Sequence, residues 1–260
     1  MTFLTDFGTK NTYVAQMKAV ALSLSNTRII DITHEVTPHN IREGAFLLQM
    51  AAPRFPVGTV HVAVVDPGVG TSRKGIMIAT NSQVLVGPDN GLLLPAARAL
   101  GSFTVYELTN PRYMISPISS TFHARDIFTP IAAHIVEGVS FEDIGSQIDD
   151  FVDLDFGQAV CNDTGIAGTV LYIDSFGNII TTIKESQIKR LKHGSMVTVS
   201  IGSKKHKIPL VKAYGFVKPQ NLLLTVGSSH LVELSMNRGN AAQKLKVKAG
   251  DMIQIHWDTT

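Results

Sequence analysis

The sequence has only one cysteine, Cys161, in 260 residues, so it can form neither an internal disulfide nor a cysteine-based zinc site. It also lacks any apolar run near the ~18 residues that a membrane-spanning helix needs. The longest runs, such as 60–65 and 92–97, have the length of a strand or a short helix. No basic segment followed by an apolar stretch opens the chain, so we expect no secretory signal and a cytoplasmic location.

Charge and aromatic residues are also scarce. Charged residues make up 17% of the chain, the formal net charge is +2, and 44% of residues are hydrophobic, which excludes a mainly disordered chain. Aromatic residues make up only 7%, too few for the interleaved basic and aromatic strands of a nucleic-acid-binding β-barrel. The densest basic cluster, residues 204–207, is interpreted as a hairpin tip. We therefore expect neither a nucleic-acid nor a membrane partner.

The first 150 residues alternate short apolar runs with helical patterns, which predicts an α/β amino-terminal domain with a mostly parallel sheet. The expected strands are 3–4, 28–32, 59–65, 75–79, 84–86 and 103–108. The expected helices are 13–24, 40–52 and 127–137. The second helix has clear end signals, because Asn40 can cap it, Glu43 follows three residues on, and Pro53 closes it.

After about residue 157 the pattern changes to short β-branched segments separated by Gly, Asn, Lys or Pro turns. This spacing predicts a smaller all-β, barrel-like carboxy-terminal domain. The expected strands are 165–173, 178–183, 195–201, 207–211, 222–226, 231–235 and 252–256. We therefore expect domains at 1–157 and 165–260, with the boundary near 155–163.

Four polar stretches rich in Gly and Pro interrupt the α/β half, at 5–9, 64–73, 87–91 and 119–126. In the first, Asp6 directly follows a strand, where ligands of open α/β sheets bind. Asp6 either binds a vicinal diol, as acidic residues bind ribose, or forms an Asx-turn. In the second, Asp66 ends a strand and Arg73 follows a Gly-rich turn, which indicates either a site or a structural ion pair. It is not a P-loop, because the Gly-Lys-Ser/Thr element is absent.

Each of the other polar stretches, taken by itself, also allows a structural interpretation. The stretch 87–91 is a turn signal. His123 lies in a polar loop just before a helix, where it is either a catalyst or a structural histidine. Phe176 lies between Asp174 and Asn178, and this segment either stacks and reads a base or forms a plain hairpin loop. The remaining histidines show no metal-site spacing.

Together these motifs resemble the family of S-adenosylmethionine hydroxide adenosyltransferases, the adenosine-forming S-adenosylmethionine hydrolases, which is related to fluorinase and chlorinase. The resemblance covers nearly the whole chain and rests on six motifs in order, at 5–8, 66–73, 87–91, 122–126, 174–178 and 240–242. It implies an α/β domain, a β-barrel-like domain and a homotrimer. S-adenosylmethionine would lie between the amino-terminal domain of one subunit and the carboxy-terminal domain of its neighbour.

The resemblance also implies which residues bind the substrate. Asp6 would hold the ribose hydroxyls. Asp174 would meet the methionine ammonium, with Ser228 or Ser229 near its carboxylate. The implied adenine contacts are Phe176 beside the ring, Asn178 at its edge, and the backbone of Asn240 and Ala241.

The implied catalytic residues are Asp66, Arg73 and His123. The sulfonium makes methionine a good neutral leaving group, so the enzyme must chiefly supply an oxygen nucleophile. Arg73 stays charged and can stabilise hydroxide, while either Asp66 or His123 takes the proton from water. This chemistry requires no metal and no other cofactor.

Two other functions fit the same motifs. An adenosyl halogenase would use chloride as the nucleophile. Against it, halogenases carry tyrosines at the positions of Asp66 and His123 and a halide-contacting serine at the position of Ala124, and they have an insertion before the segment matching 87–88. A non-catalytic sensor of adenosine or S-adenosylmethionine would retain its ligand without releasing methionine.

Overall fold

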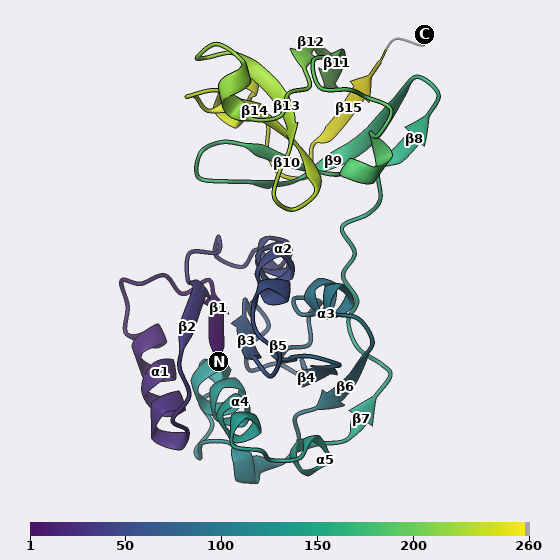
Figure 1. Ribbon diagram of the computed structural model, residues 1–260. Helices are drawn as coiled ribbons and strands as arrows, with labels where there is room; N and C mark the ends of the chain where they lie inside the picture. Colours follow the sequence, from purple (N-terminus) through teal and green to yellow (C-terminus); the bar gives the residue numbers. More distant parts are fainter. Residues whose placement is uncertain (258–260) are drawn as a thin grey trace. The chain divides into compact units, whose positions relative to one another are not determined.

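The computed structural model describes residues 1–257 (Figure 1). The chain divides into two compact units, Met1–Asp155 and Phe156–Thr260. The first unit combines helices with a sheet, and the second consists mainly of strands. Within the described residues, no helix is both long and apolar enough to cross a membrane.

The first unit contains every strand and helix that the sequence predicts for it. Its strands are β1 (Thr2–Thr5), β2 (Ile30–Thr33), β3 (Val60–Val64), β4 (Gly75–Thr80), β5 (Val84–Pro88), β6 (Phe103–Glu107) and β7 (Gln147–Ile148). Its helices are α1 (Tyr13–Leu24), α2 (Ile41–Ala51), α3 (Leu94–Leu100), α4 (Thr129–Val136) and α5 (Phe141–Ile144), with a π-helical turn η3 (Ala124–Phe128) before α4. The short elements α3, α5 and β7 were not predicted, because their few residues carry no clear period.

The seven strands form one sheet in the order β2-β1-β3-β5-β4-β6-β7. The first four are parallel, whereas β4, β6 and β7 pair antiparallel. The sheet is therefore mixed, and the expectation of a mostly parallel sheet holds only for its first four strands. The physical reason is the connection between β4 and β5, whose three residues allow only a hairpin, since a parallel crossover needs about a dozen.

Helices cover both faces of this sheet (Figure 1). Phe3 of β1 belongs to a core cluster with Met17 of α1 and Ile131 of α4. The next residue, Leu4, points the other way and lies beside Gly44 of α2. Because both faces are covered, β3 is buried at every position, and four of its five residues are apolar, as is usual for parallel strands.

The predicted start of the second helix is confirmed. The Asn40 side chain accepts a hydrogen bond from the Glu43 amide at 3.2 Å and donates one to the Glu43 carboxylate at 3.0 Å. These bonds satisfy an amide that the first turn of a helix leaves unpaired. Pro53 lies in the short 3₁₀ turn η1 (Ala52–Arg54) that ends the helix.

The second unit is a nearly closed antiparallel sheet. Its strands are β8 (Val160–Asn162), β9 (Gly165–Ile173), β10 (Ile179–Lys184), β11 (Met196–Ile201), β12 (Lys204–Pro209), β13 (Leu222–Val226), β14 (Leu231–Met236) and β15 (Met252–His256). The order is β12-β11-β15-β9-β10-β14-β13, with β8 beside β9. A bridge between Leu210 and Leu224 joins the two ends, so the barrel-like prediction is confirmed.

The basic cluster of this unit lies in a strand and not at a hairpin tip. Lys204 pairs with Ile201, so the turn consists of Gly202 and Ser203 alone, and Gly202 has a φ of +56°. The interpretation of 204–207 as the tip is therefore wrong, because the turn needs only two residues. Lysines on an outer strand discourage pairing with another chain.

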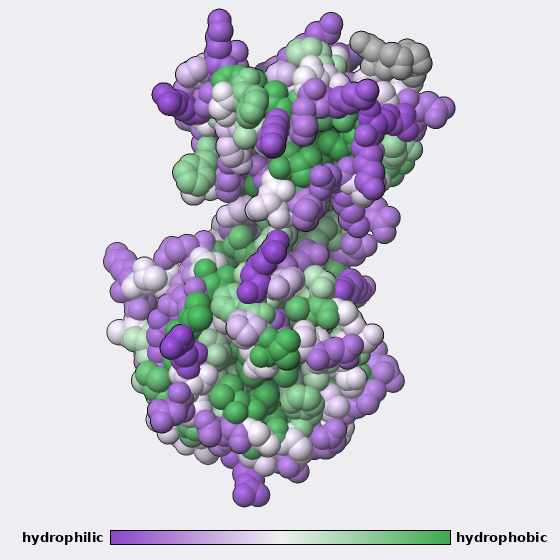
Figure 2. Space-filling model, in the orientation of Figure 1, coloured by the Kyte–Doolittle hydropathy of each residue, from purple (hydrophilic) through white to green (hydrophobic). Residues whose placement is uncertain are grey.

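Polar side chains alternate with apolar areas on the face drawn in Figure 2. Among the exposed apolar side chains are Phe176 and Phe216 of the second unit, whose exposed fractions are 76% and 69%. Single exposed apolar residues of this kind are common on protein surfaces.

A buried histidine links three segments of the first unit. His61 of β3 has no exposed surface; its Nδ1 lies 2.7 Å from Thr2 Oγ1 and its Nε2 lies 3.0 Å from Gln83 Oε1. Gln83 donates its amide hydrogen to the Phe55 carbonyl, so its oxygen accepts from His61 Nε2. Burial lowers the pKa of His61 to about 4, so at neutral pH the ring is neutral and its proton is on Nε2.

We predict that the first unit loses stability between pH 6.5 and pH 4. The unfolded ring binds a proton at about pH 6.5 and the folded ring only near pH 4, so acid favours the unfolded chain by roughly 3 kcal/mol. Urea unfolding across this range should show a steeper fall for the wild type than for His61→Gln. His39→Asn, which removes an exposed histidine of the same unit, is the control and should follow the wild type. Parallel profiles for His61→Gln and the wild type would refute the assignment.

Candidate active site

Two of the candidate carboxylates lie at the same edge of the first sheet. Strands β1 and β3 are parallel neighbours, and Thr5 is paired with Val64. Asp6 follows β1 and Asp66 follows β3, so both come just after the carboxyl ends of adjacent strands. This is where open α/β sheets bind their ligands.

Asp66, Arg73 and His123 form one contiguous hydrogen-bonded group. Arg73 Nη2 donates to Asp66 Oδ2 at 2.6 Å and lies 3.1 Å from His123 Nδ1. A guanidinium only donates, so His123 Nδ1 is the acceptor and the proton of the neutral ring is on Nε2. The side chains of Asp66 and Arg73 are only 5% and 9% exposed. The arginine therefore bridges the carboxylate and the imidazole in a largely dry environment.

Three neighbouring features hold this group in place. Gly70 has a φ of +76°, and a Cβ there would overlap the Ser120 carbonyl. Because glycine has no Cβ, the 66–73 loop can approach the segment before His123. The Arg73 guanidinium lies over the Phe128 ring at 5.3 Å. Asn90 donates to the carbonyl of residue 65 at 2.8 Å, which shows that the 87–91 stretch supports the loop carrying Asp66.

The electrostatics distinguish the carboxylate from the imidazole. Burial raises the pKa of the Asp66 carboxyl, and the charge and hydrogen bond of Arg73 oppose the rise. Burial and the nearby Arg73 charge lower the pKa of His123. Asp66 Oδ1 is buried, and although the Gly68 amide lies near the carboxylate, Oδ1 accepts no well-formed hydrogen bond from the described residues. That oxygen keeps its acceptor capacity for another donor.

Asp6 is partly buried at the end of β1. Its Oδ2 accepts the His39 amide at 2.8 Å, and His39 has a φ of +67°. This contact fixes one carboxylate oxygen against a loop. A carboxylate has about four acceptor positions, so the bond leaves Asp6 able to bind a diol.

An aromatic cluster lies beside Asp6 and His123, and the sequence analysis did not predict it. Phe7, Tyr13 and Phe122 contact one another edge to face, with ring centroids 5.3–6.0 Å apart, and Arg125 lies over Phe122 at 4.9 Å. The cluster lines a cavity of about 420 Å³. The only feature of the sequence that could have indicated this cluster is that Phe7 follows Asp6 and Phe122 precedes His123.

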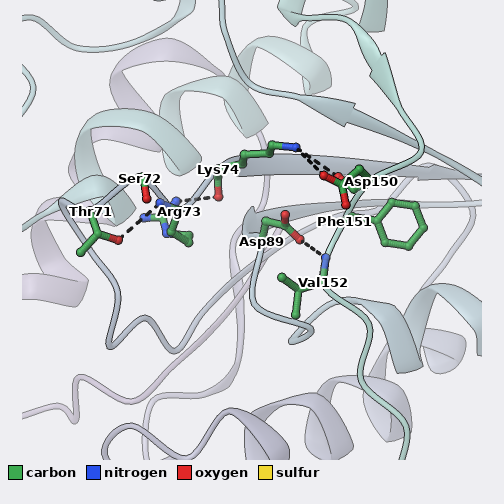
Figure 3. Close-up of a pocket in the computed structure, with 8 residues that line it drawn as sticks. All are labelled: Thr71, Ser72, Arg73, Lys74, Asp89, Asp150, Phe151 and Val152. Carbon is green, nitrogen blue, oxygen red and sulfur yellow. Dashed lines mark hydrogen bonds and ion pairs between the residues drawn. The ribbon is translucent and has the colours of Figure 1, made fainter.

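A second, polar cavity of about 430 Å³ adjoins Arg73 (Figure 3). Two contacts hold its far wall to the Arg73 segment. Asp89 accepts the Val152 amide at 2.8 Å, and Lys74 Nζ donates to the Asp150 carbonyl at 3.2 Å. These contacts give Asp89 of the 87–91 stretch a structural role.

In the second unit, the carboxylate of Asp174 organises its own turn. Oδ1 accepts the amides of Phe176 and Asn178, both at 2.9 Å, and Oδ2 accepts the Asn178 side-chain amide at 2.8 Å. The segment thus forms a hairpin loop, as one of the two interpretations predicts. Phe176 projects from the turn with 76% exposure, whereas Asn178 is buried.

The 174–178 turn and the 240–242 segment lie together. Ala242 donates its amide to the Gly177 carbonyl at 3.0 Å, and a side chain at Gly177 would overlap Asn240. The Asn240 side chain caps helix α6 (Ala241–Leu245) by accepting the Gln243 amide at 2.7 Å, and Ala241 is buried. Two motifs that are 62 positions apart in the sequence thus form one surface.

Ser228 and Ser229 lie in the turn between β13 and β14, which starts at Gly227. Glu233 of β14, which the sequence did not single out, lies against Gly227 and accepts a hydrogen bond from Tyr214 at 2.9 Å. Within residues 1–257, no three His, Cys, Asp or Glu side chains form a group that could hold a metal ion.

Comparison with known proteins identifies the family of the chain. The SAM hydroxide adenosyltransferase N-terminal domain matches residues 1–145, and the C-terminal domain of the same family matches residues 168–254. The chain is thus a two-domain protein that belongs to the SAM hydroxide adenosyltransferase family.

Individual relatives are similar over nearly their whole length. A Salinispora tropica protein named (R)-S-adenosyl-L-methionine hydrolase is 38% identical over 98% of this chain and 97% of its own. A fluorinase from an Actinoplanes species is 23% identical over 97% of this chain and 96% of its own. The crystal structure of an uncharacterized conserved protein from Thermotoga maritima superimposes with a TM-score of 0.94 at 38% identity, covering 98% of this chain and 99% of that one.

We predict that Gly70→Ala disrupts the Arg73–His123 contact. The new methyl group would meet the Ser120 carbonyl, in addition to the roughly 1–2 kcal/mol that a left-handed backbone costs a non-glycine residue. Urea unfolding and the ¹⁵N shift of His123 Nδ1 would measure both effects. Gly58→Ala is the matched control, because Gly58 has a φ of +84° and open space around it. An unchanged His123 shift in Gly70→Ala would contradict this role.

Proposed function

We propose that the protein hydrolyses S-adenosylmethionine to adenosine and L-methionine by attack of water or hydroxide at the ribose C5′ carbon. The observation that carries this proposal is the buried group in which Arg73 bridges Asp66 and His123. Family membership and the 38% identity to a protein named as a hydrolase support it. The fluorinase relative is less similar, at 23% identity.

The three residues make and hold the oxygen nucleophile. Methionine leaves as a neutral thioether, so no acid has to protonate it, and the barrier depends on the attacking oxygen. Arg73 supplies a permanent positive charge that stabilises hydroxide. Holding that oxygen in line with the C5′–S bond contributes further, because an oriented reaction avoids much of the entropic cost of encounter.

We infer that Asp66, and not His123, accepts the proton from water. His123 already uses Nδ1 to accept from Arg73, and its other nitrogen carries a proton, so it is a hydrogen-bond donor. Its lowered pKa also disfavours a second proton. Asp66 has an oxygen without a partner, and burial raises the pKa of its carboxyl toward the operating pH, as a general base requires.

The remaining residues bind the substrate in this proposal. Asp6 accepts the ribose hydroxyls, and Asp174 accepts the methionine ammonium. Ser228 or Ser229 lies near the carboxylate. The adenine is held by Phe176, Asn178, Asn240 and Ala241. The high exposure of Phe176 supports its part, because most of the ring is free to pack on a ligand.

We further propose a homotrimer with its sites at subunit interfaces. The α/β domain, proposed at 1–157, would supply the ribose site and the hydroxide-activating group. The β domain, proposed at 165–260, would supply the adenine and methionine contacts. No metal or other cofactor takes part. The exposed, unpaired Cys161 is compatible with a reducing cytoplasm as the location.

Substitutions in the catalytic group should lower kcat and leave KM nearly unchanged, because none of the three residues is assigned to binding. Asp66→Asn should cost about 10²–10⁴-fold, the usual range for loss of a general base, and Arg73→Ala a similar factor. His123→Gln should cost less, since it keeps a donor near the Nε2 position. Asp153→Asn, which removes an exposed carboxylate of the same unit, is the control. Near-normal turnover of Asp66→Asn would exclude it as the base.

The source of the new oxygen distinguishes hydrolysis from the halogenase alternative. Turnover in heavy-oxygen water should place the label on the 5′ oxygen of adenosine, because attack occurs at carbon. Added chloride should give no chlorinated nucleoside. Mass spectrometry of the products measures both. Unlabelled adenosine would refute attack by water at C5′, and ligand retained without release of methionine would indicate a sensor.

A further inference from the structure

Glu233 is a carboxylate that is buried although it lies on the outer face of its strand. Its neighbours along β14, Val232 and Leu234, point into the core and have no exposed surface. Because side chains alternate in a strand, Glu233 points to the outer face, where a charged residue is normally solvated. It is nevertheless only 8% exposed. Burial of a carboxylate on an outer face calls for a functional or structural reason.

The burial comes from the segment around Tyr214. The Tyr214 hydroxyl donates to Glu233 Oε2 at 2.9 Å. Thr225, the residue opposite Glu233 on β13, donates to the Lys212 carbonyl at 3.4 Å, which fastens this segment along the strand. The other oxygen, Oε1, lies where a side chain at Gly227 would be, and no described residue donates a hydrogen bond to it. One oxygen of Glu233 is thus positioned and the other is available.

Glu233 also lies between the two segments assigned to the methionine arm. It is paired with Ile180 on β10, the strand that follows the Asp174 turn, and with Thr225 on β13, the strand that leads into the Ser228–Ser229 turn. Burial raises the pKa of Glu233, and the negative charge of Asp174 adds to the rise. Among the described residues, no Lys, Arg or His forms an ion pair with either.

We propose that Glu233 is a second carboxylate ligand of the substrate's α-ammonium group, beside Asp174, and that it makes the site specific for sulfonium compounds with a free amino-acid head. This inference rests on the proposed function. An ammonium group has three N–H donors, and Asp174 already accepts three hydrogen bonds from its own turn. A bound cation would also relieve the repulsion between two carboxylates that have no basic partner. Tyr214 is a positioning residue that orients Glu233.

The test compares Glu233→Gln with the wild type on two ligands. One is S-adenosylmethionine, and the other is its desamino analogue, a sulfonium with a carboxypropyl arm. Gln has the shape of Glu and can still accept from Tyr214, so the fold should persist. We expect Glu233→Gln to weaken binding of S-adenosylmethionine by roughly tenfold or more, as for other charged hydrogen bonds, and to leave binding of the analogue and of adenosine unchanged. Calorimetry measures all three affinities, with both proteins carrying Asp66→Asn so that S-adenosylmethionine is turned over slowly.

Tyr214→Phe separates a binding role from a purely structural one. It removes the hydrogen bond but keeps both carboxylates, so it should weaken discrimination between the two ligands less than Glu233→Gln does. Equal discrimination by the wild type and Glu233→Gln would overturn the inference, as would an equal loss of affinity for both ligands. A wild type that discriminates by calorimetry but releases no methionine would overturn the proposed hydrolysis and leave the ammonium site standing.

Discussion

The arrangement of the first unit depends on one buried interaction, the contact of the Arg73 guanidinium with Asp66 and His123. Removing a carboxylate and a guanidinium from water is costly, and their attraction offsets that cost only when the geometry is good and further hydrogen bonds exist. Here the Lys74 carbonyl accepts from Nη1 at 2.9 Å, and the Phe128 ring lies beneath the guanidinium. The absence of a side chain at Gly70 allows the 66–73 loop to lie against Ser120, close to His123. Loss of either charge would leave the other buried and unpaired.

The topology explains why the contact forms where it does. Adjacent parallel strands end at one edge, so the residues after β1 and β3 are brought together although 60 positions separate Asp6 from Asp66. His123 precedes η3, and it contacts Arg73 where the loop at Gly70 lies against Ser120. Strand order therefore accounts for the positions of Asp6 and Asp66, and loop packing accounts for that of His123.

The fold and the candidate site could be predicted from the sequence only in part. Period and capping signals were enough for α2 and for the β-rich half, because local interactions determine them. The antiparallel strands of the first sheet were not predicted. They depend on the short connection between β4 and β5, and the alternation of strands and helices along the chain does not reveal it. The environment of Glu233 was beyond local reasoning. Its alternation in β14 indicates an exposed residue, and only a segment 19 positions earlier, at Tyr214, buries it.

Carboxylates of one chemical type thus acquire different tasks from their surroundings. Asp66 is buried beside Arg73, whose charge opposes the rise in pKa that burial causes, and this combination suits a base. Asp174 accepts three hydrogen bonds from its own turn and is held rigidly, which suits a binding group. Among the described residues, Glu233 has no ion-pair partner and accepts one hydrogen bond, from Tyr214. A carboxyl group buried in this way is stabilised either by taking up a proton, the direction in which burial moves its pKa, or by a positive group, and the proposed ammonium contact is the second case.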